Sequence, residues 1–209
     1  FYDTLAVAGK VVLDFACHYY PNVLEAMRTR WISPQILVTN RIDTASYDEV
    51  RKMGQQVIDA LGIWTSATHM EWFAGEKGLK FSEIGCRPPG VGVWDLYSTA
   101  NDFDLYAAWA HAIVHEDVPF KTSRKFSAGM IALRPDQDGT ISHYEGVEQM
   151  HDKFGEHIID MHLPPAGTPT QEVAGGYMAN AYVRLKHTDF DKLRQIMNTI
   201  GETVKVKAR

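Results

Sequence analysis

The sequence contains little cysteine and no long apolar run. Its 209 residues include two cysteines, Cys17 and Cys86, too few for the disulfide framework of a small secreted scaffold. No segment resembles a signal peptide, and no apolar stretch is long enough to span a bilayer. We therefore expect a cytoplasmic protein without a membrane partner.

Clusters of basic residues are also missing. The net charge is −5, and the lysines and arginines are scattered along the chain, so no basic patch suggests nucleic acid as a partner. Since 45% of the residues are apolar, the chain can bury a core as one large domain or two small ones. A small molecule is the expected ligand.

The first residues predict that this chain is part of a longer protein. The chain begins with Phe1 rather than methionine, and residues 2–7 already have the composition of a strand. We expect an upstream part of the same protein, which becomes a predicted partner of this chain.

Apolar periodicity and turn residues predict the elements. The first half is expected to hold a hairpin over 1–19, a strand over 36–39, a helix over 46–61, a hairpin over 68–84 and a helix over 102–115. The helix over 46–61 has Asp43, Thr44 or Ser46 as candidate N-caps and Gly62 as its stop. The second half is expected to hold strands over 126–133, 139–144, 157–161 and 176–185, a helix over 189–199 and a strand over 203–206.

This change of pattern predicts an α+β protein with two domains. Residues 1–120 form an antiparallel sheet with packed helices, and residues 121–209 form a small, mostly antiparallel module with a helix. The boundary falls after Pro119, where short β segments broken by glycine begin.

The hairpin over 68–84 carries the clearest candidate site. With a turn over 74–78, Glu71 pairs with Phe81 and His69 with Glu83, so the two glutamates become diagonal neighbours on one face. Two long carboxylates at that spacing can close around one or two divalent ions. The alternative is a solvated face that merely carries two glutamates.

The neighbours of the glutamates favour the metal site. The expected register puts His69, Phe73, Leu79 and Phe81 on the same face, which makes that face half apolar. Desolvation and mutual repulsion of the carboxylates then invite a cation, and hard oxygen ligands favour Mg²⁺ or Mn²⁺.

The loop after the second strand supplies a positive charge and glycines. Arg87 follows Glu83 by four residues and can donate two hydrogen bonds to a phosphate or another oxyanion. Gly90 and Gly92 permit close approach of the backbone to a substrate carboxylate, with the segment from Trp94 or Asp95 offering amides. A salt bridge is the alternative for Arg87, and ordinary loop chemistry for the glycines.

The pattern from His69-Met70-Glu71 to Glu83-Ile84-Gly85-Cys86-Arg87 resembles the magnesium signature of the ATP-grasp superfamily. It is similar to the biotin-carboxylase-like and carboxylate-amine ligase branches, where a second glutamate opens the motif Glu-Ile-Asn-x-Arg. The resemblance implies that the chain is the C-terminal ATP-grasp subdomain, followed by a small barrel-like β module with a helix. It also implies that Glu71 and Glu83 bind the Mg²⁺ of ATP and that Arg87 steadies the transferred phosphoryl group.

The resemblance therefore implies a fragment of an ADP-forming ligase, which activates a carboxylate as an acyl phosphate for attack by an amine or similar nucleophile. The upstream lysine-bearing subdomain and the adenine-gripping hinge of the family are missing, so the isolated chain is expected to be inactive. Gly85 stands where the family usually has asparagine, which removes one metal contact. A homodimer is a further candidate for the assembly of the protein.

Two other functions stay open from the residues alone. A degenerate ATP-grasp module could bind nucleotide or protein without turnover. A hydrolase using the glutamate pair as acid and base is disfavoured, because it needs divergent pKa values and gives Arg87 no role. Zinc is also disfavoured, since His111 and His115 lack the intervening glutamate of a zinc-protease helix, and His69 is expected to be a hydrogen-bonded sheet histidine.

Overall fold

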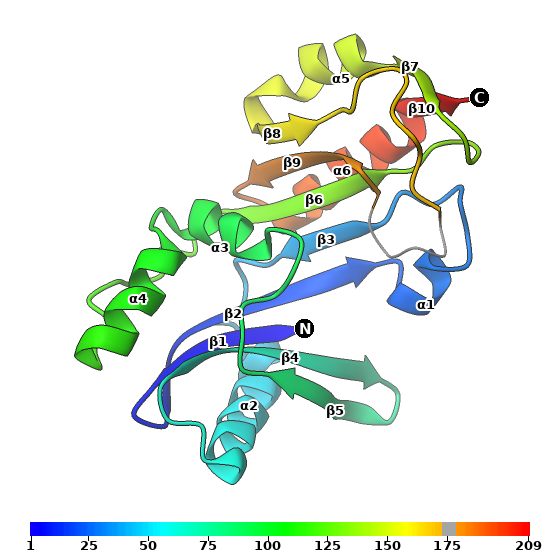
Figure 1. Ribbon diagram of the computed structural model, residues 1–209. Helices are drawn as coiled ribbons and strands as arrows, with labels where there is room; N and C mark the ends of the chain where they lie inside the picture. Colours follow the sequence, from blue (N-terminus) through cyan, green and yellow to red (C-terminus); the bar gives the residue numbers. More distant parts are fainter. Residues whose placement is uncertain (173–178) are drawn as a thin grey trace. The chain divides into compact units, whose positions relative to one another are not determined.

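The computed structural model describes residues 1–172 and 179–209, and these residues form two compact units. Unit 1 comprises residues 1–17 and 38–125, and unit 2 comprises residues 18–37 and 126–209. Figure 1 shows helices and β-sheet in both units, and the predicted α+β class is confirmed. The division at residue 120 into functional domains stays a prediction.

Unit 1 is built on antiparallel strands in the order β5-β4-β1-β2. Its strands are β1 (Tyr2–Val7), β2 (Lys10–Tyr20, of which the last three residues belong to unit 2), β4 (Ser66–Gly75) and β5 (Gly78–Gly85). Its helices are the 3-10 turn η1 (Ala45–Tyr47), α2 (Asp48–Leu61), α3 (Val93–Asn101) and α4 (Leu105–His115).

Helix α2 packs on one face of this sheet. Tyr2, Ala6, Ile58 and Met70 are buried together there. Gly54 lies in the middle of α2, and a Cβ at this position would come within 2.4 Å of the Tyr2 ring. The helix can approach β1 this closely because residue 54 has no side chain.

Helix α3 contributes aromatic contacts elsewhere in unit 1. The Tyr97 ring stacks on Phe15 of β2 with ring centroids 4.4 Å apart. The Trp94 ring meets Trp109 of α4 edge to face at 5.4 Å. Both Trp94 and Tyr97 are buried, so α3 is firmly attached to the sheet that carries the candidate site.

Unit 2 has strands in the order β3-β6-β9-β8 and a separate antiparallel pair, β7 and β10. Its strands are β3 (Gln35–Val38), β6 (Ser127–Leu133), β7 (Ile141–Glu145), β8 (Ile158–His162), β9 (Ala181–His187) and β10 (Lys205–Ala208). Its helices are α1 (Val23–Ala26), α5 (Val147–Phe154), the 3-10 turn η2 (Gly155–His157) and α6 (Phe190–Thr203).

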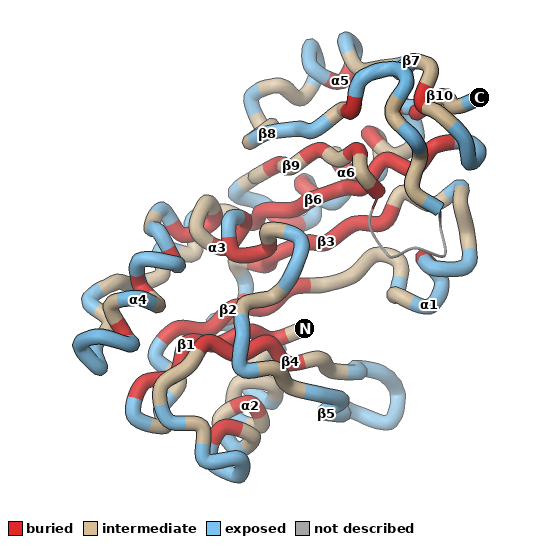
Figure 2. The backbone as a smooth tube through the Cα atoms, viewed as in Figure 1, coloured by how far each residue is buried: buried red, intermediate tan, exposed pale blue. Residues whose placement is uncertain are grey.

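Helix α6 covers the sheet of unit 2 and closes its core. Leu193, Met197 and Ile200 are buried against Ile131 of β6 and Val183 of β9. Figure 2 shows β6 buried along its length and β9 with buried residues between intermediate ones. None of the described helices is both long enough and apolar enough to cross a membrane.

Most predicted elements are present with shifted ends. Helix α2 ends at Leu61 with Gly62 in the left-handed conformation, which confirms the predicted stop. The predicted N-caps are wrong, because the preceding turn η1 leads directly into α2 and Tyr47 takes the cap position without a side-chain bond. Helix α4 begins at Leu105 rather than Asp102. Residues 176–178 of the strand predicted over 176–185 lie outside the described residues, and β9 begins at Ala181.

Besides the four-residue α1, two longer helices were not predicted, α3 and α5. Both begin after a glycine in the left-handed conformation, Gly92 with φ 68° and Gly146 with φ 80°, and neither has a side-chain cap. The usual N-terminal signal of serine, threonine, aspartate or asparagine is therefore missing from the sequence at both positions.

Candidate functional site

The hairpin of β4 and β5 places Glu71 directly opposite Glu83. The predicted diagonal arrangement is wrong, because the turn contains only Glu76 and Lys77 and because a bulge at Ser82 shifts the register. Directly opposite residues have Cβ atoms about 4.5–5.5 Å apart, closer than diagonal ones. The Cβ atoms of the two glutamates therefore lie nearer to each other than the sequence predicted.

The corrected register also changes which side chains share the face of the glutamates. Phe81 pairs with Trp72, and their rings meet edge to face at 5.2 Å. Because side chains alternate along a strand, Leu79 and Phe81 lie on the face opposite Glu71, contrary to the prediction. Phe73, which is 68% exposed, and its partner Lys80 remain on the face of Glu71.

A buried chain of polar groups leads to Glu71. Asp3 on β1 pairs in register with His69 on β4, and Nδ1 of His69 lies 2.6 Å from Oδ1 of Asp3. The hydroxyl of Tyr97 donates to the other oxygen of Asp3. On the far side of the ring, Nε2 of His69 lies 3.3 Å from Oε1 of Glu71. The prediction that His69 is a hydrogen-bonded sheet histidine is confirmed.

The two carboxylates change the protonation of His69. Burial by itself lowers the pKa of the ring, but the hydrogen bonds and negative charges of Asp3 and Glu71 outweigh it and raise the pKa to about 9. The ring therefore carries a positive charge at neutral pH. This charge offsets part of the repulsion between Glu71 and Glu83.

Glu83 and Arg87 are exposed. Within residues 1–172 and 179–209, Arg87 forms no ion pair, and its Nη1 donates to the carbonyl oxygen of Pro88 at 2.9 Å. The salt-bridge alternative for Arg87 is therefore not seen in this part of the chain. A guanidinium held in this way keeps most of its donors for an external anion.

Gly85 lies underneath the stem of Arg87. A Cβ at Gly85 would be 3.3 Å from Cγ and 3.4 Å from Nε of Arg87. The Arg87 side chain therefore lies against the place where the first atoms of an asparagine side chain, usual in the ATP-grasp motif, would lie at residue 85. The missing side chain at residue 85 gives Arg87 room to fold over the end of β5.

The loop that follows β5 ends at the start of α3. Gly92 adopts φ 68° as the N-cap of α3, and the carbonyl of Gly90 accepts from the amide of Val93 at 3.2 Å. Apart from its neighbours in the chain, no atom of the described residues lies within 4 Å of a Cβ placed on Gly90. The glycines therefore shape an open loop, and their contact with a substrate carboxylate stays a prediction.

The donor set of the hairpin fits a magnesium ion that arrives with phosphate. Glu71 and Glu83 offer hard oxygen ligands at direct-pair spacing, which Mg²⁺ prefers in combination with substrate phosphates and water. Among the residues that the structure describes, no group of three or more His, Cys, Asp or Glu side chains could hold a metal ion alone. Phosphate oxygens would have to complete the coordination.

The sequence did not indicate Asp3 and Tyr97 as part of this site. Asp3 lies within a fully buried strand, Tyr2–Val7, and a carboxylate within an apolar strand is a signal that can be read from the sequence. The pairing of β1 with β4 joins residues 66 positions apart, and this partnership is not visible without the fold.

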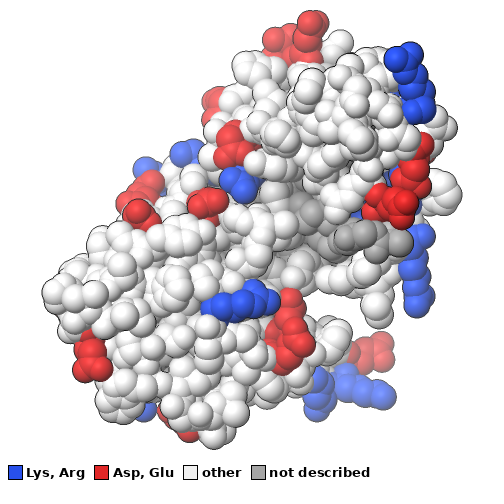
Figure 3. Space-filling model, in the orientation of Figure 1, with Lys and Arg blue, Asp and Glu red and all other residues white. Residues whose placement is uncertain are grey.

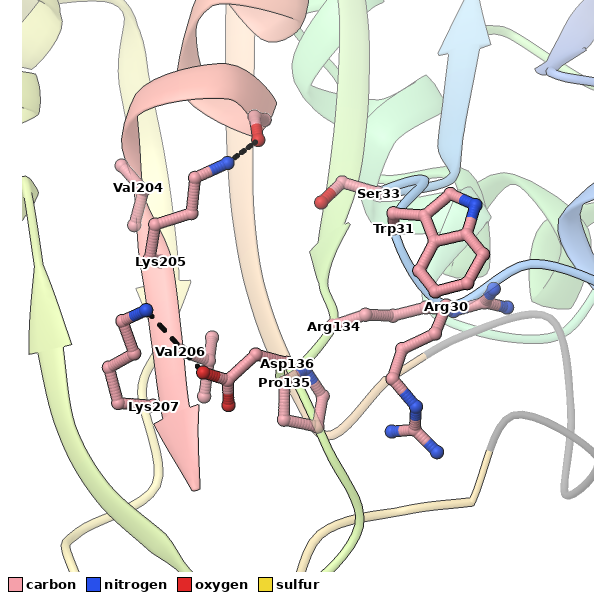
Figure 4. A pocket seen from close by; sticks show the side chains of 11 residues that line it. Arg30, Trp31, Ser33, Arg134, Pro135, Asp136, Val204, Lys205, Val206 and Lys207 are labelled. Carbon is pink, nitrogen blue, oxygen red and sulfur yellow. Dashed lines mark hydrogen bonds and ion pairs between the residues drawn. The ribbon is translucent and has the colours of Figure 1, made fainter. Parts of the chain in front are cut away.

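Figure 4 shows a cavity of about 200 Å³ in unit 2 that is lined by several charged side chains. Two of its cations have acidic partners in the same unit: Nη2 of Arg30 lies 2.5 Å from Asp138, and Nζ of Lys207 lies 3.4 Å from Asp136. Arg134, 9% exposed, donates to the carbonyl oxygen of Thr29 at 2.6 Å. The contacts of Arg30 and Arg134 attach the 18–37 segment to the residues that follow β6, and the contact of Lys207 attaches β10 to the same residues.

Charges on the visible face do not gather into one patch. In Figure 3, acidic and basic side chains lie interspersed over both units. This distribution agrees with the scattered lysines and arginines of the sequence.

No family model matches the chain, but a curated relative does. The chain is 27% identical over 171 residues to a formate-dependent phosphoribosylglycinamide formyltransferase from Bacteroides thetaiotaomicron. The match covers 79% of this chain and 41% of that relative. The chain therefore spans less than half of the relative's length.

Solved structures have the same fold. The L-amino acid ligase from Bacillus licheniformis matches all of this chain and 51% of its own chain, with a TM-score of 0.75 and 13% identity. The biotin carboxylase domain of the 2-oxoglutarate carboxylase from Hydrogenobacter thermophilus matches 98% of this chain and 45% of its own, with a TM-score of 0.60 and 13% identity. These proteins are ATP-grasp enzymes, so the predicted resemblance to the C-terminal part of the ATP-grasp fold is confirmed.

Proposed function

We propose that this chain is the metal-binding half of an ATP-dependent, ADP-forming ligase. The register that sets Glu71 opposite Glu83 is the observation that carries the proposal. The similarity to an L-amino acid ligase and to a carboxylase domain crystallised with MgADP and bicarbonate supports it. In the proposed reaction a substrate carboxylate takes the γ-phosphoryl group of ATP, and an amine or similar nucleophile then displaces phosphate from the acyl phosphate.

Each residue has a defined part in this proposal. Glu71 and Glu83 would hold Mg²⁺ or Mn²⁺ against the ATP phosphates, and the ion supplies charge neutralisation and orientation. Arg87 would donate its free N–H groups to the transferred phosphoryl group or to the substrate carboxylate. Gly90 and Gly92 would let the loop backbone approach the substrate closely. Catalysis then depends on positioning and charge rather than on covalent chemistry by the protein.

Glu83→Gln in the full-length protein that contains this chain tests the proposal. We expect loss of ADP formation, because the variant removes one charged metal ligand and leaves the fold intact. Glu76→Gln, in the turn of the same hairpin, is the matched control and should keep full activity. Normal turnover by Glu83→Gln would contradict the proposal.

A degenerate module is the second candidate, and Gly85 favours it. The stem of Arg87 covers the position where the family's third metal ligand would stand. A degenerate module would bind MgADP. In the ADP assay it would form no ADP from ATP with any carboxylate tested. Carboxylate-dependent ADP formation would exclude it.

The proposal includes a homodimer as an assembly, since the related carboxylase domain is a dimer in its structure. The identity of the carboxylate and of the nucleophile depends on residues of both halves of the enzyme. Screening the full-length protein with amino acids and with bicarbonate, and measuring ADP, would identify the substrate class.

A further inference from the structure

We propose that His69 is a positioning residue for the metal ligand Glu71, held in place by Asp3 and Tyr97; this inference rests on the proposed function. The four side chains form one continuous contact path on unit 1, from α3 through β1 to β4. The path ends at the carboxylate that faces Glu83.

The geometry of the ring supports an orienting role. Its two nitrogens face carboxylate oxygens of different residues, Asp3 at 2.6 Å and Glu71 at 3.3 Å. A ring held on both sides has little freedom to rotate, and the edge-to-face contact with Phe1 at 5.0 Å restricts it further.

Burial distinguishes this path from a surface ion pair. Asp3 is 1% exposed, His69 9% and Tyr97 0%, whereas the side chain of Glu71 is 27% exposed. The path therefore runs from a rigid interior to an accessible carboxylate. This is the arrangement by which outer groups fix the direction of a metal ligand.

Satisfying Asp3 alone would not require the contact to Glu71. Asp3 already accepts from Tyr97, and a neutral His69 could donate to it through Nδ1 only. Instead, Nε2 of His69 is directed to Glu71, two positions further along β4. Alternation of side chains places residues 69 and 71 on that face together.

The test measures the Mg²⁺ concentration that gives half-maximal ADP formation by the full-length protein. His69→Gln should raise this concentration about tenfold, the lower end of the range for loss of a group that orients a metal ligand. Tyr97→Phe keeps the ring that stacks on Phe15 and should give a smaller shift in the same direction. At saturating Mg²⁺ both variants should recover most of the activity.

Thr68→Val is the matched control. The Thr68 and Thr4 hydroxyls lie 2.7 Å apart on the same two strands, and both residues are buried, as are His69 and Asp3. Because side chains alternate along a strand, Thr68 and Thr4 point to the opposite face from His69 and Asp3. This variant should lower stability without moving the Mg²⁺ dependence.

The outcomes separate the two proposals. If Glu71→Gln and Glu83→Gln keep normal activity, the proposed function fails and the positioning role falls with it. If both lose activity while folded His69→Gln and Tyr97→Phe keep the original Mg²⁺ dependence, only the positioning role is wrong. A shift in His69→Gln that Thr68→Val reproduces would also overturn it, since the effect would then follow stability.

Discussion

Single residues decide the electrostatics of the candidate site. His69 places one positive charge between a buried carboxylate and an accessible one. Gly85 removes a side chain and lets Arg87 fold back over the strand end. Both features have consequences that can be measured on single substitutions.

The raised pKa of His69 predicts a pH-dependent stability. The pKa is about 9 in the folded chain against 6.5 for an unperturbed histidine, so the folded state binds the proton more tightly. The stabilisation is complete below pH 6.5 and is lost as the pH rises from 6.5 through 9. Its size is on the order of 3 kcal/mol.

Chemical unfolding of the 209-residue chain in EDTA between pH 6 and 10 checks this prediction. His69→Gln should show a flatter profile over that window. His115→Gln, on the same unit but remote from the buried carboxylates, should keep the original slope. Parallel profiles for the chain and for His69→Gln would contradict the raised pKa.

Gly85→Asn should strengthen metal binding. The new side chain adds the amide oxygen usual in the family, and Arg87 can yield by a few tenths of an ångström because its stem is flexible. We expect a lower Mg²⁺ requirement for ADP formation by the full-length protein, with stability changed by less than about 1 kcal/mol. Gly85→Ala fills the same space without the oxygen and should not lower the requirement.

At the scale of elements, the hairpin shows where sequence reasoning succeeds and where it stops. Alternation and turn residues correctly predicted two strands with a glutamate on each. The register depended on the turn length and on a bulge at Ser82, neither of which periodicity determines. An error of one residue in the turn moved Leu79 and Phe81 to the wrong face.

Two helix starts and one contact between distant strands could not be predicted from the sequence. The helices α3 and α5 begin at left-handed glycines, so the usual N-cap residues were missing. The pairing of Asp3 with His69 requires β1 to lie beside β4. The residues of the candidate site could be named from their motif, whereas the side chains that hold them could not.

The turn of this hairpin gives a prediction about folding. Gly78 has φ 79°, a conformation costly for any residue with a Cβ, whereas Gly75 has no positive φ. In the part of the chain that the structure describes, only chain neighbours lie within 4 Å of a Cβ placed on either glycine. Gly78→Ala should therefore lower the free energy of unfolding by about 1 kcal/mol. Gly75→Ala should leave it nearly unchanged.

Denaturant titrations of the two alanine variants, with amide exchange of the hairpin as a local readout, compare them directly. Equal effects of the two substitutions on the free energy of unfolding would contradict the difference in backbone conformation between Gly78 and Gly75.

At the scale of the whole molecule, the chain corresponds to about half of the solved ATP-grasp enzymes that it matches, 51% of the L-amino acid ligase for example. We therefore predict that the 209-residue chain binds MgADP more weakly than the full-length protein does. Isothermal titration of both with MgADP measures the difference. Equal affinities would place the nucleotide site entirely within this chain.

The two units are interleaved along the chain, since residues 18–37 belong with residues 126–209. A gene fragment that begins near codon 121 would encode β6, β9 and β8 but not β3, the neighbour of β6, nor the carbonyls that receive Arg134. Recombination at a single breakpoint could not transplant the second unit into another enzyme. Moving the second unit into another protein would require both of its segments, 18–37 and 126–209, to be transferred together.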